Sequence, residues 1–170
     1  MKNDASWMLF ALLLLIPFLH CAPKDPGQLT LVNSGVEIHK ISVDGRTFTV
    51  YPSNHITKDV SSGIRQIKVD GGESIDVTVA KGLTTLFDTT GLSCYAIVDF
   101  SPAKEGSLPR VIGRSKMERI FTTPMPMMAV LGSVFPKKPP KGAPFTRIHQ
   151  VDCEIIDDDS EIVEEVRFFP

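Results

Sequence analysis

The chain has 170 residues, of which 42% are hydrophobic and 22% are charged, and its formal net charge is −2. This length is enough for one domain, and no repeat of fixed period stands out in the sequence.

The first twenty residues have the organisation of a secretory signal peptide. A short polar start carrying Lys2 precedes an uncharged run of thirteen residues at 7–19. A helix of this run would span about 20 Å, whereas the hydrocarbon core of a bilayer is about 30 Å thick. The run is therefore typical of a removable export signal rather than of a permanent membrane span.

The sequence Phe-Leu-His-Cys at residues 18–21 resembles the lipobox of bacterial lipoproteins, although His20 stands where that family has a small residue. The resemblance implies that residues 1–20 are removed and that Cys21 carries the lipid. Ala22 in place of aspartate implies an outer-membrane destination in a Gram-negative host. The alternative is ordinary secretion, into the periplasm or beyond, or a signal anchor that is retained.

After a polar tether at 21–27, residues 28–101 are predicted to form the core of the domain. An opening strand at 29–32 ends at a turn cluster, Asn33-Ser34-Gly35. A nearly continuous apolar run, residues 94–100, predicts a central strand that is covered on both faces. Strands at this spacing with glycine-containing turns indicate a mostly β protein, a small antiparallel β-sandwich of the immunoglobulin-like type.

Two hairpins are predicted within this core. Their turns are Asp44-Gly45, which is typical of a type I′ turn, and Asp70-Gly71-Gly72. The strands that they join are residues 36–43 with 46–51, and 64–69 with 73–79. Apolar residues change phase within 36–43 and within 64–69, so we expect a β-bulge in each.

Residues 41–79 resemble the PEGA-type β-sandwich modules of bacterial envelope proteins, although the four-residue motif that names the family is absent. The resemblance is carried by the positions of turns and strand ends: Val43-Asp44-Gly45, Pro52, Ser62-Gly63 before the strand at 64–69, and a last strand ending at Val79. It implies a fold and no activity.

Residues 102–170 are predicted to be a proline-rich extension and C-terminal part that pack on the same domain. Ser115 and Glu118 have capping-box spacing, which predicts one or two helical turns at Ile120 and Phe121. Six prolines between 124 and 144 exclude a long helix or a central strand there. A final strand is expected at 146–156, and a short helix, with an edge strand as the alternative, at 159–169.

The charges are unevenly distributed along the chain. Residues 22–101 carry 7 basic and 9 acidic side chains, residues 102–147 carry 9 and 2, and residues 148–170 carry 1 and 8. The basic and acidic stretches are expected to neutralise each other on one surface. Together with the export signal, this argues against nucleic acid as a partner.

If Cys21 carries the lipid, two cysteines remain, Cys94 and Cys153. An oxidising compartment favours a disulfide between them over two buried free thiols. A second function class, a thiol-dependent enzyme, would use Cys94 as its nucleophile with His149 or His55 as base. Ser93 lies in a near match to the nucleophile-elbow motif, but Tyr95 replaces its second glycine.

Methionines gather at Met125, Met127 and Met128, and thioethers are soft ligands that suit Cu(I). With His149 they define a third function class, a periplasmic copper-handling protein. The alternative is that these methionines fill the core and that His149 lies at a strand rim. The acidic run 157–161 is interpreted as a solvated turn rather than a calcium site, because it lacks the glycine of an EF-hand loop.

The first expectation is therefore a membrane-anchored envelope lipoprotein that acts as a non-catalytic binding or scaffolding domain. Its expected partners are the membrane, through the lipid on Cys21, and an envelope protein or polysaccharide. No cofactor is expected.

Overall fold

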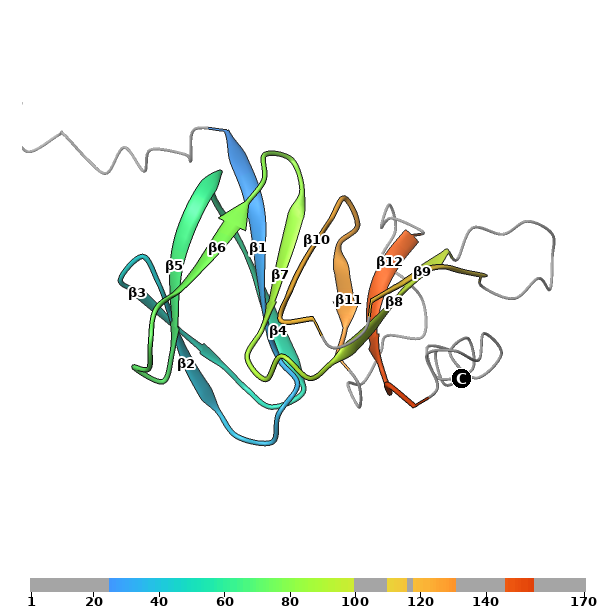
Figure 1. Cartoon of the computed structure of the whole chain (residues 1–170), viewed down its shortest axis with the longest axis horizontal. Coiled ribbons are helices and arrows are strands. Elements are labelled where there is room, and N and C mark those ends of the chain that lie inside the picture. The colour runs from blue at the N-terminus through green and yellow to red at the C-terminus, as the bar shows by residue number, and fades with distance from the viewer. Residues whose placement is uncertain (1–24, 100–109, 116–117, 131–145, 155–170) are drawn as a thin grey trace, which may run out of the picture.

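The computed structural model describes residues 25–99, 110–115, 118–130 and 146–154. These residues form twelve strands and no helix, which confirms the predicted mostly β fold. The strands make three four-stranded, mostly antiparallel sheets, here called sheets A, B and C, and sheets A and B form a small β-sandwich (Figure 1).

Sheet A has the order β10-β7-β1-β4, with β1 and β7 parallel and the other neighbours antiparallel. Its strands are β1 (Pro26–Asn33), β4 (Asn54–Ser61), β7 (Thr84–Asp88) and β10 (Ile120–Thr123). Sheet B is fully antiparallel, with the order β3-β2-β5-β6. Its strands are β2 (His39–Val43), β3 (Arg46–Val50), β5 (Gly63–Val69) and β6 (Ile75–Val79).

Sheet C has the order β11-β12-β8-β9, with a parallel pair at β11 and β12. Its strands are β8 (Cys94–Asp99), β9 (Arg110–Ser115), β11 (Met127–Ala129) and β12 (Thr146–Val151). The apolar run beginning at Cys94 lies between β12 and β9, so its prediction as a central strand is confirmed.

Sheet A packs against a sheet on each of its faces. Leu29, Leu31 and Phe87 contact the apolar side chains of sheet B, whereas Val32 and Leu86 contact those of sheet C. A fully buried side chain of this size contributes about 1.5–3 kcal/mol to stability. Because β1 and β7 are covered on both faces, their sequences lack the apolar and polar alternation of a half-exposed strand.

The two predicted hairpins are present as β2–β3 and β5–β6. Asp44 and Gly45 both have positive φ values, 47° and 82°, as a type I′ turn requires. The predicted bulges are wrong. Strand β2 begins only at His39, after the exposed Val36, and neither β2 nor β5 has a shift of register against its neighbours.

Three strands of sheet A differ from the sequence-based expectations. Strands β4 and β7 were not expected, and β10 occupies residues for which a helical turn was predicted. Phe121 of β10 pairs with Leu86 of β7, so sheet pairing outweighs the local capping signal. The expected final strand is confirmed as β12, although it ends at Val151.

The remaining predictions for this half of the chain concern residues outside the described ranges. They concern most of the proline-rich stretch and the element at 159–169.

The two long sides of the A–B sandwich differ. Where β6 meets β7, the Thr85 hydroxyl donates to the Thr78 carbonyl at 3.4 Å, and the Gln28 amide donates to the Leu83 carbonyl at 2.9 Å. Gly27 lies against the Ala80 carbonyl, where an added Cβ would collide with it. On the other side stand the edge strands β3 and β4, and no hydrogen bond between described residues joins them along their length.

A buried carboxylate, Asp88, joins sheet A to sheet C at the end of β7. It accepts hydrogen bonds from the Tyr95 hydroxyl at 2.6 Å, the Thr90 amide and hydroxyl at 2.8 Å, and the Ser34 hydroxyl at 3.0 Å. Burial by itself raises the pKa of Asp88, but the hydrogen bonds from Ser93, Tyr95 and Thr90 outweigh it, so this pKa lies below its ordinary value. Asp88 is therefore ionised at neutral pH.

Replacing Tyr95 by phenylalanine removes one donor to this carboxylate and little volume. We expect Tyr95→Phe to lower the free energy of unfolding by about 1.5–3 kcal/mol, the range for a hydrogen bond to a charged group. Urea denaturation measures this change. The matched control is Tyr51→Phe, since Tyr51 is 59% exposed; equal stability of the two variants would contradict the assignment.

Candidate functional site

The structure places the two cysteines predicted to pair next to each other, as a disulfide. Cys94 begins β8 and Cys153 lies two residues after the end of β12, with their Cα atoms 5.2 Å apart. Cys94 is fully buried. In the disulfide it has no thiolate, so the bonded form offers no nucleophile.

Ser93, the other candidate nucleophile, is also buried and accepts a hydrogen bond from Gln150 Nε2 at 2.9 Å. It leads into strand β8 rather than into the helix that a nucleophile elbow requires. His55, one of the two suggested bases, lies on β4 in sheet A, whereas Cys94 lies on sheet C.

The candidate copper ligands are divided between the two faces of sheet C. Met127 is buried with Val32, Leu86 and Ile148, and Met125 packs against the same cluster. His149 pairs with Ala96, which belongs to the cluster on the opposite face. Met128 lies in β11, but its side chain is outside the described part of the chain. The two described methionines thus fill the core.

His149 is 1% exposed, so the expectation of a rim histidine is wrong. Burial lowers the pKa of His149 to about 4, with a further contribution from the nearby Arg147 charge. The imidazole is therefore neutral at pH 7.

Other predicted site residues fall outside the described ranges or form no cluster. Cys21 and the acidic run 157–161 are not described. Across the described ranges, no three histidine, cysteine, aspartate or glutamate side chains gather closely enough to hold a metal ion. Those same ranges contain no helix with the length and apolar character needed to cross a bilayer.

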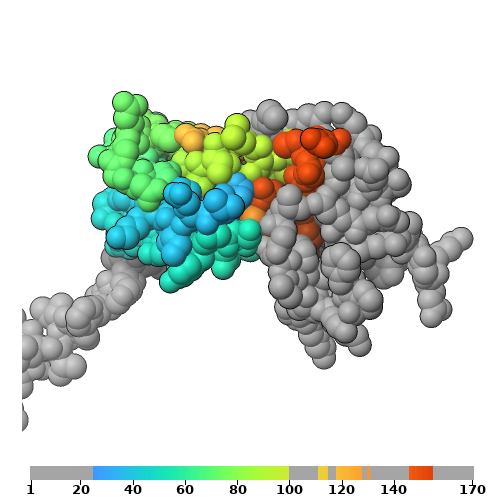
Figure 2. Space-filling model, turned by 90° about the horizontal axis from the view of Figure 1, so that it is seen from below, coloured from blue at the N-terminus to red at the C-terminus, as the bar shows by residue number. Residues whose placement is uncertain are grey.

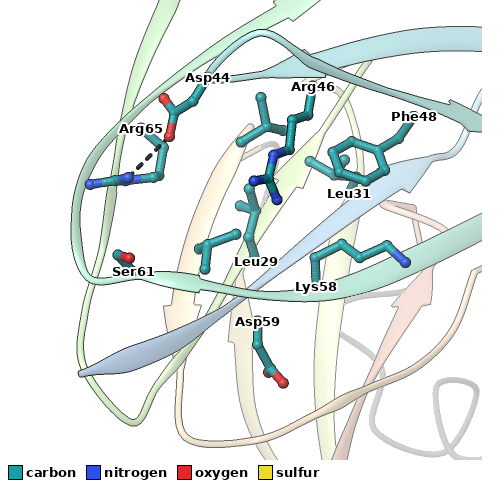
Figure 3. Close-up of a pocket in the computed structure, with 11 residues that line it drawn as sticks. Leu29, Leu31, Asp44, Arg46, Phe48, Lys58, Asp59, Ser61 and Arg65 are labelled. Atoms are coloured by element: carbon teal, nitrogen blue, oxygen red, sulfur yellow. Dashed lines mark hydrogen bonds and ion pairs between the residues drawn. The ribbon is translucent and has the colours of Figure 1, made fainter. Parts of the chain in front are cut away.

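The open side of the A–B sandwich forms a cleft of about 500 Å³ between edge strands β3 and β4 (Figure 3). We call this space the edge cleft. Its floor consists of the core residues Leu29 and Leu31 of β1. Val43 and Val60 also line the cleft. Its upper wall carries Arg46 and Phe48 of β3, and its lower wall carries Lys58 and Ser61 of β4. Asp59 of β4 also borders the cleft, with its carboxylate on the outer side of the strand.

Strand register explains why basic groups face this cleft. Lys58 pairs with Leu29 and Ile56 pairs with Leu31, so Lys58 shares the face that packs toward sheet B. On β3, Arg46 has the same phase as Val50, which is buried in the sandwich core. Two cations thus stand at positions where a sandwich strand carries core residues.

The acidic groups of the cleft are already engaged. Asp44 pairs with Arg65 at 3.0 Å and accepts the Gln66 amide at 2.9 Å. Asp59 has the opposite phase from Lys58, points away from the cleft, and accepts a hydrogen bond from Gln28 Nε2 at 3.4 Å. The edge cleft therefore presents two cations, Arg46 and Lys58, over an apolar floor.

The two cations differ in their surroundings. The Lys58 ammonium lies 5.7 Å from the centre of the Phe48 ring, a cation–π contact worth about 0.5–1 kcal/mol at an exposed site. No ion pair or hydrogen bond joins the Arg46 side chain to another described residue. Its exposed guanidinium is therefore available to a planar anion such as a carboxylate.

Sequence analysis missed this site, although a signal was present. In NHITKDVS, residues 54–61, Ile56 and Val60 alternate with Lys58 at the intermediate core-facing position. In RTFTV, residues 46–50, Arg46 has the phase of Phe48 and Val50. A basic residue in the apolar phase of an edge strand would have indicated the site.

Comparison with known proteins gives no relative. No family model matches the chain, and neither a curated protein nor a solved structure matches it. The lipoprotein and PEGA-type resemblances stay predictions.

The disulfide closes a loop with a sequence separation of 59 residues. In the chain-entropy model, its removal should lower the free energy of unfolding by about 4 kcal/mol. We expect this loss in Cys94→Ala/Cys153→Ala, measured by urea denaturation, and no change in the control Cys21→Ala. Thiol counting in denaturant without reductant should find no free Cys94 or Cys153. Two free thiols would contradict the disulfide and reopen the enzyme hypothesis.

Proposed function

We propose that this protein is an exported, lipid-anchored envelope protein whose β-sandwich binds a partner through the edge cleft without catalysing a reaction. The observation that carries the binding function is the edge cleft itself. An apolar floor flanked by a few oriented charged groups is the usual composition of a recognition site.

Two features support an extracytoplasmic location. The lipobox-like residues 18–21 follow a short apolar run, and the paired Cys94 and Cys153 suit an oxidising compartment. With residues 1–20 removed, Cys21 would carry the lipid and residues 21–25 would join it to β1.

Copper handling is a weaker proposal. It would need Met125 and Met127 to leave the core cluster that they share with Tyr95 and Ile148. A thiol-dependent reaction would need the Cys94–Cys153 disulfide to be reduced. The edge cleft needs neither change.

Lipid anchoring is tested by growth of expressing cells with labelled palmitate. The full chain should incorporate the label and sediment with membranes, whereas Cys21→Ala should do neither. Cys153→Ala serves as the control, because it removes a cysteine outside the lipobox-like sequence. Equal labelling of the full chain and Cys21→Ala would overturn the anchor.

Binding at the cleft is tested by placing a photo-crosslinking amino acid at Ser61, which lines the cleft, in cells that express the chain naturally. The control position is Thr78, an exposed residue on β6 at the far edge of sheet B. We expect a discrete adduct from position 61 and none from position 78. The absence of any adduct specific to position 61 would overturn the cleft as the binding site.

A further inference from the structure

The edge cleft is bounded by two strands whose outer edges have no neighbouring strand among the described residues. Strand β4 has eight residues, and within the described part of the chain it pairs only with β1, as β3 pairs only with β2. The central residues of β4, Thr57, Lys58 and Asp59, are exposed, as are Arg46 and Thr47 of β3. Figure 2 shows residues of about 40 to 60, in cyan and teal, at the molecular surface.

A long exposed edge strand has unpaired backbone groups and can accept a further strand. A strand added to β4 would extend sheet A in its own plane. Alternate side chains of that strand would then point toward sheet B, into the edge cleft, while the others would point away. The cleft would select only every second residue of the added strand.

The residues that line the cleft also define which side chains of the added strand would fit there. Leu29, Leu31 and Val60 offer apolar contact, so one kind of inward residue is aliphatic or aromatic. Arg46 and Lys58 offer positive charge that Asp44 and Asp59 do not neutralise, so the other kind is acidic. A basic peptide would meet both cations at close range.

We propose that the edge cleft binds an extended, acidic segment of a separate protein, which adds as a strand to β4. Its recognition pattern is an acidic and an apolar residue two positions apart, both facing the cleft. This inference rests on the proposed binding function and names its ligand class. Main-chain hydrogen bonds to β4 supply affinity, and the contacts with Arg46 and Lys58 supply specificity.

Charged residues on edge strands also prevent sheets from pairing edge to edge. That role needs a charge of either sign and no particular ligand. The recognition role, in contrast, requires positive charge at Arg46 and Lys58 and predicts discrimination between acidic and basic peptides.

The test uses synthetic peptides of about eight residues, the length of β4, titrated into the full chain without its signal segment. In the acidic probe, valine and glutamate alternate at every second position with threonine between them. The control probe has lysine in place of glutamate. We expect the acidic probe to bind at least about tenfold more tightly at low ionic strength, with the difference shrinking in high salt because exposed charges are screened.

Two matched double variants locate the effect. Arg46→Gln/Lys58→Gln should remove the preference for the acidic probe. Lys40→Gln/Lys68→Gln removes the same charge from exposed positions on β2 and β5 that do not line the cleft, and should keep the preference. Hydrogen exchange should show new protection of β4 amides on binding. Equal affinity for both probes, preference kept in the cleft variant, or unchanged β4 exchange overturns the proposal.

Other occupants are separate outcomes. If removal of the acidic residues 155–170 increases affinity for the probe, the chain itself fills the cleft and the claim of a separate protein is wrong. If the chain dimerises with concentration and dimerisation is lost in the cleft variant, a second copy fills it. A lipid or polysaccharide adduct from position 61 would refute the peptide while keeping the proposed binding function.

Discussion

The structure depends on a sheet whose two middle strands are buried on both faces. Residues 29–33 of β1 and all of β7 are buried, so sheets B and C both pack on residues that are adjacent in sequence, such as Leu31 and Val32. Asp88 ends β7 as an ionised group within this packing. It is stabilised because the Ser34 loop, the Thr90 turn and Tyr95 of sheet C all donate to it. One carboxylate thus joins three segments, of which the Ser34 loop is distant along the chain.

This arrangement explains which elements could be predicted from sequence. The hairpins at Asp44-Gly45 and Asp70-Gly71-Gly72 were predictable because turn chemistry is local. Strand β7, with the sequence TTLFD, has no alternation because it is buried on both faces. Strand β4 mixes Lys58 with Ile56 and Val60 in one phase, so its apolar pattern is interrupted. The local sequence before residues 120–123 predicts the start of a helix, but in the structure these residues pair with β7 as a strand.

The site residues divide in the same way. The pairing of Cys94 with Cys153 could be inferred from the number of cysteines and from the predicted export signal, because these two features need no knowledge of the fold. The burial of Met127 and His149 on opposite faces of sheet C depends on register, which one sequence does not specify. The edge cleft lies between β3 of sheet B and β4 of sheet A, which follow each other in the chain but do not pair. Its walls therefore depend on how the two sheets pack, which local sequence patterns do not specify.

The central position of β1 has a mechanical consequence for the proposed anchor. Only residues 22–25 separate Cys21 from β1, so the two are at most about 18 Å apart. The beginning of β1 would therefore stay close to the bilayer, as would its register partner Ser61 at one end of the edge cleft. Tension on the lipid would pull along β1, between antiparallel β4 and parallel β7. It would load the hydrogen bonds of both neighbours in shear, all at once, rather than peel them apart one by one.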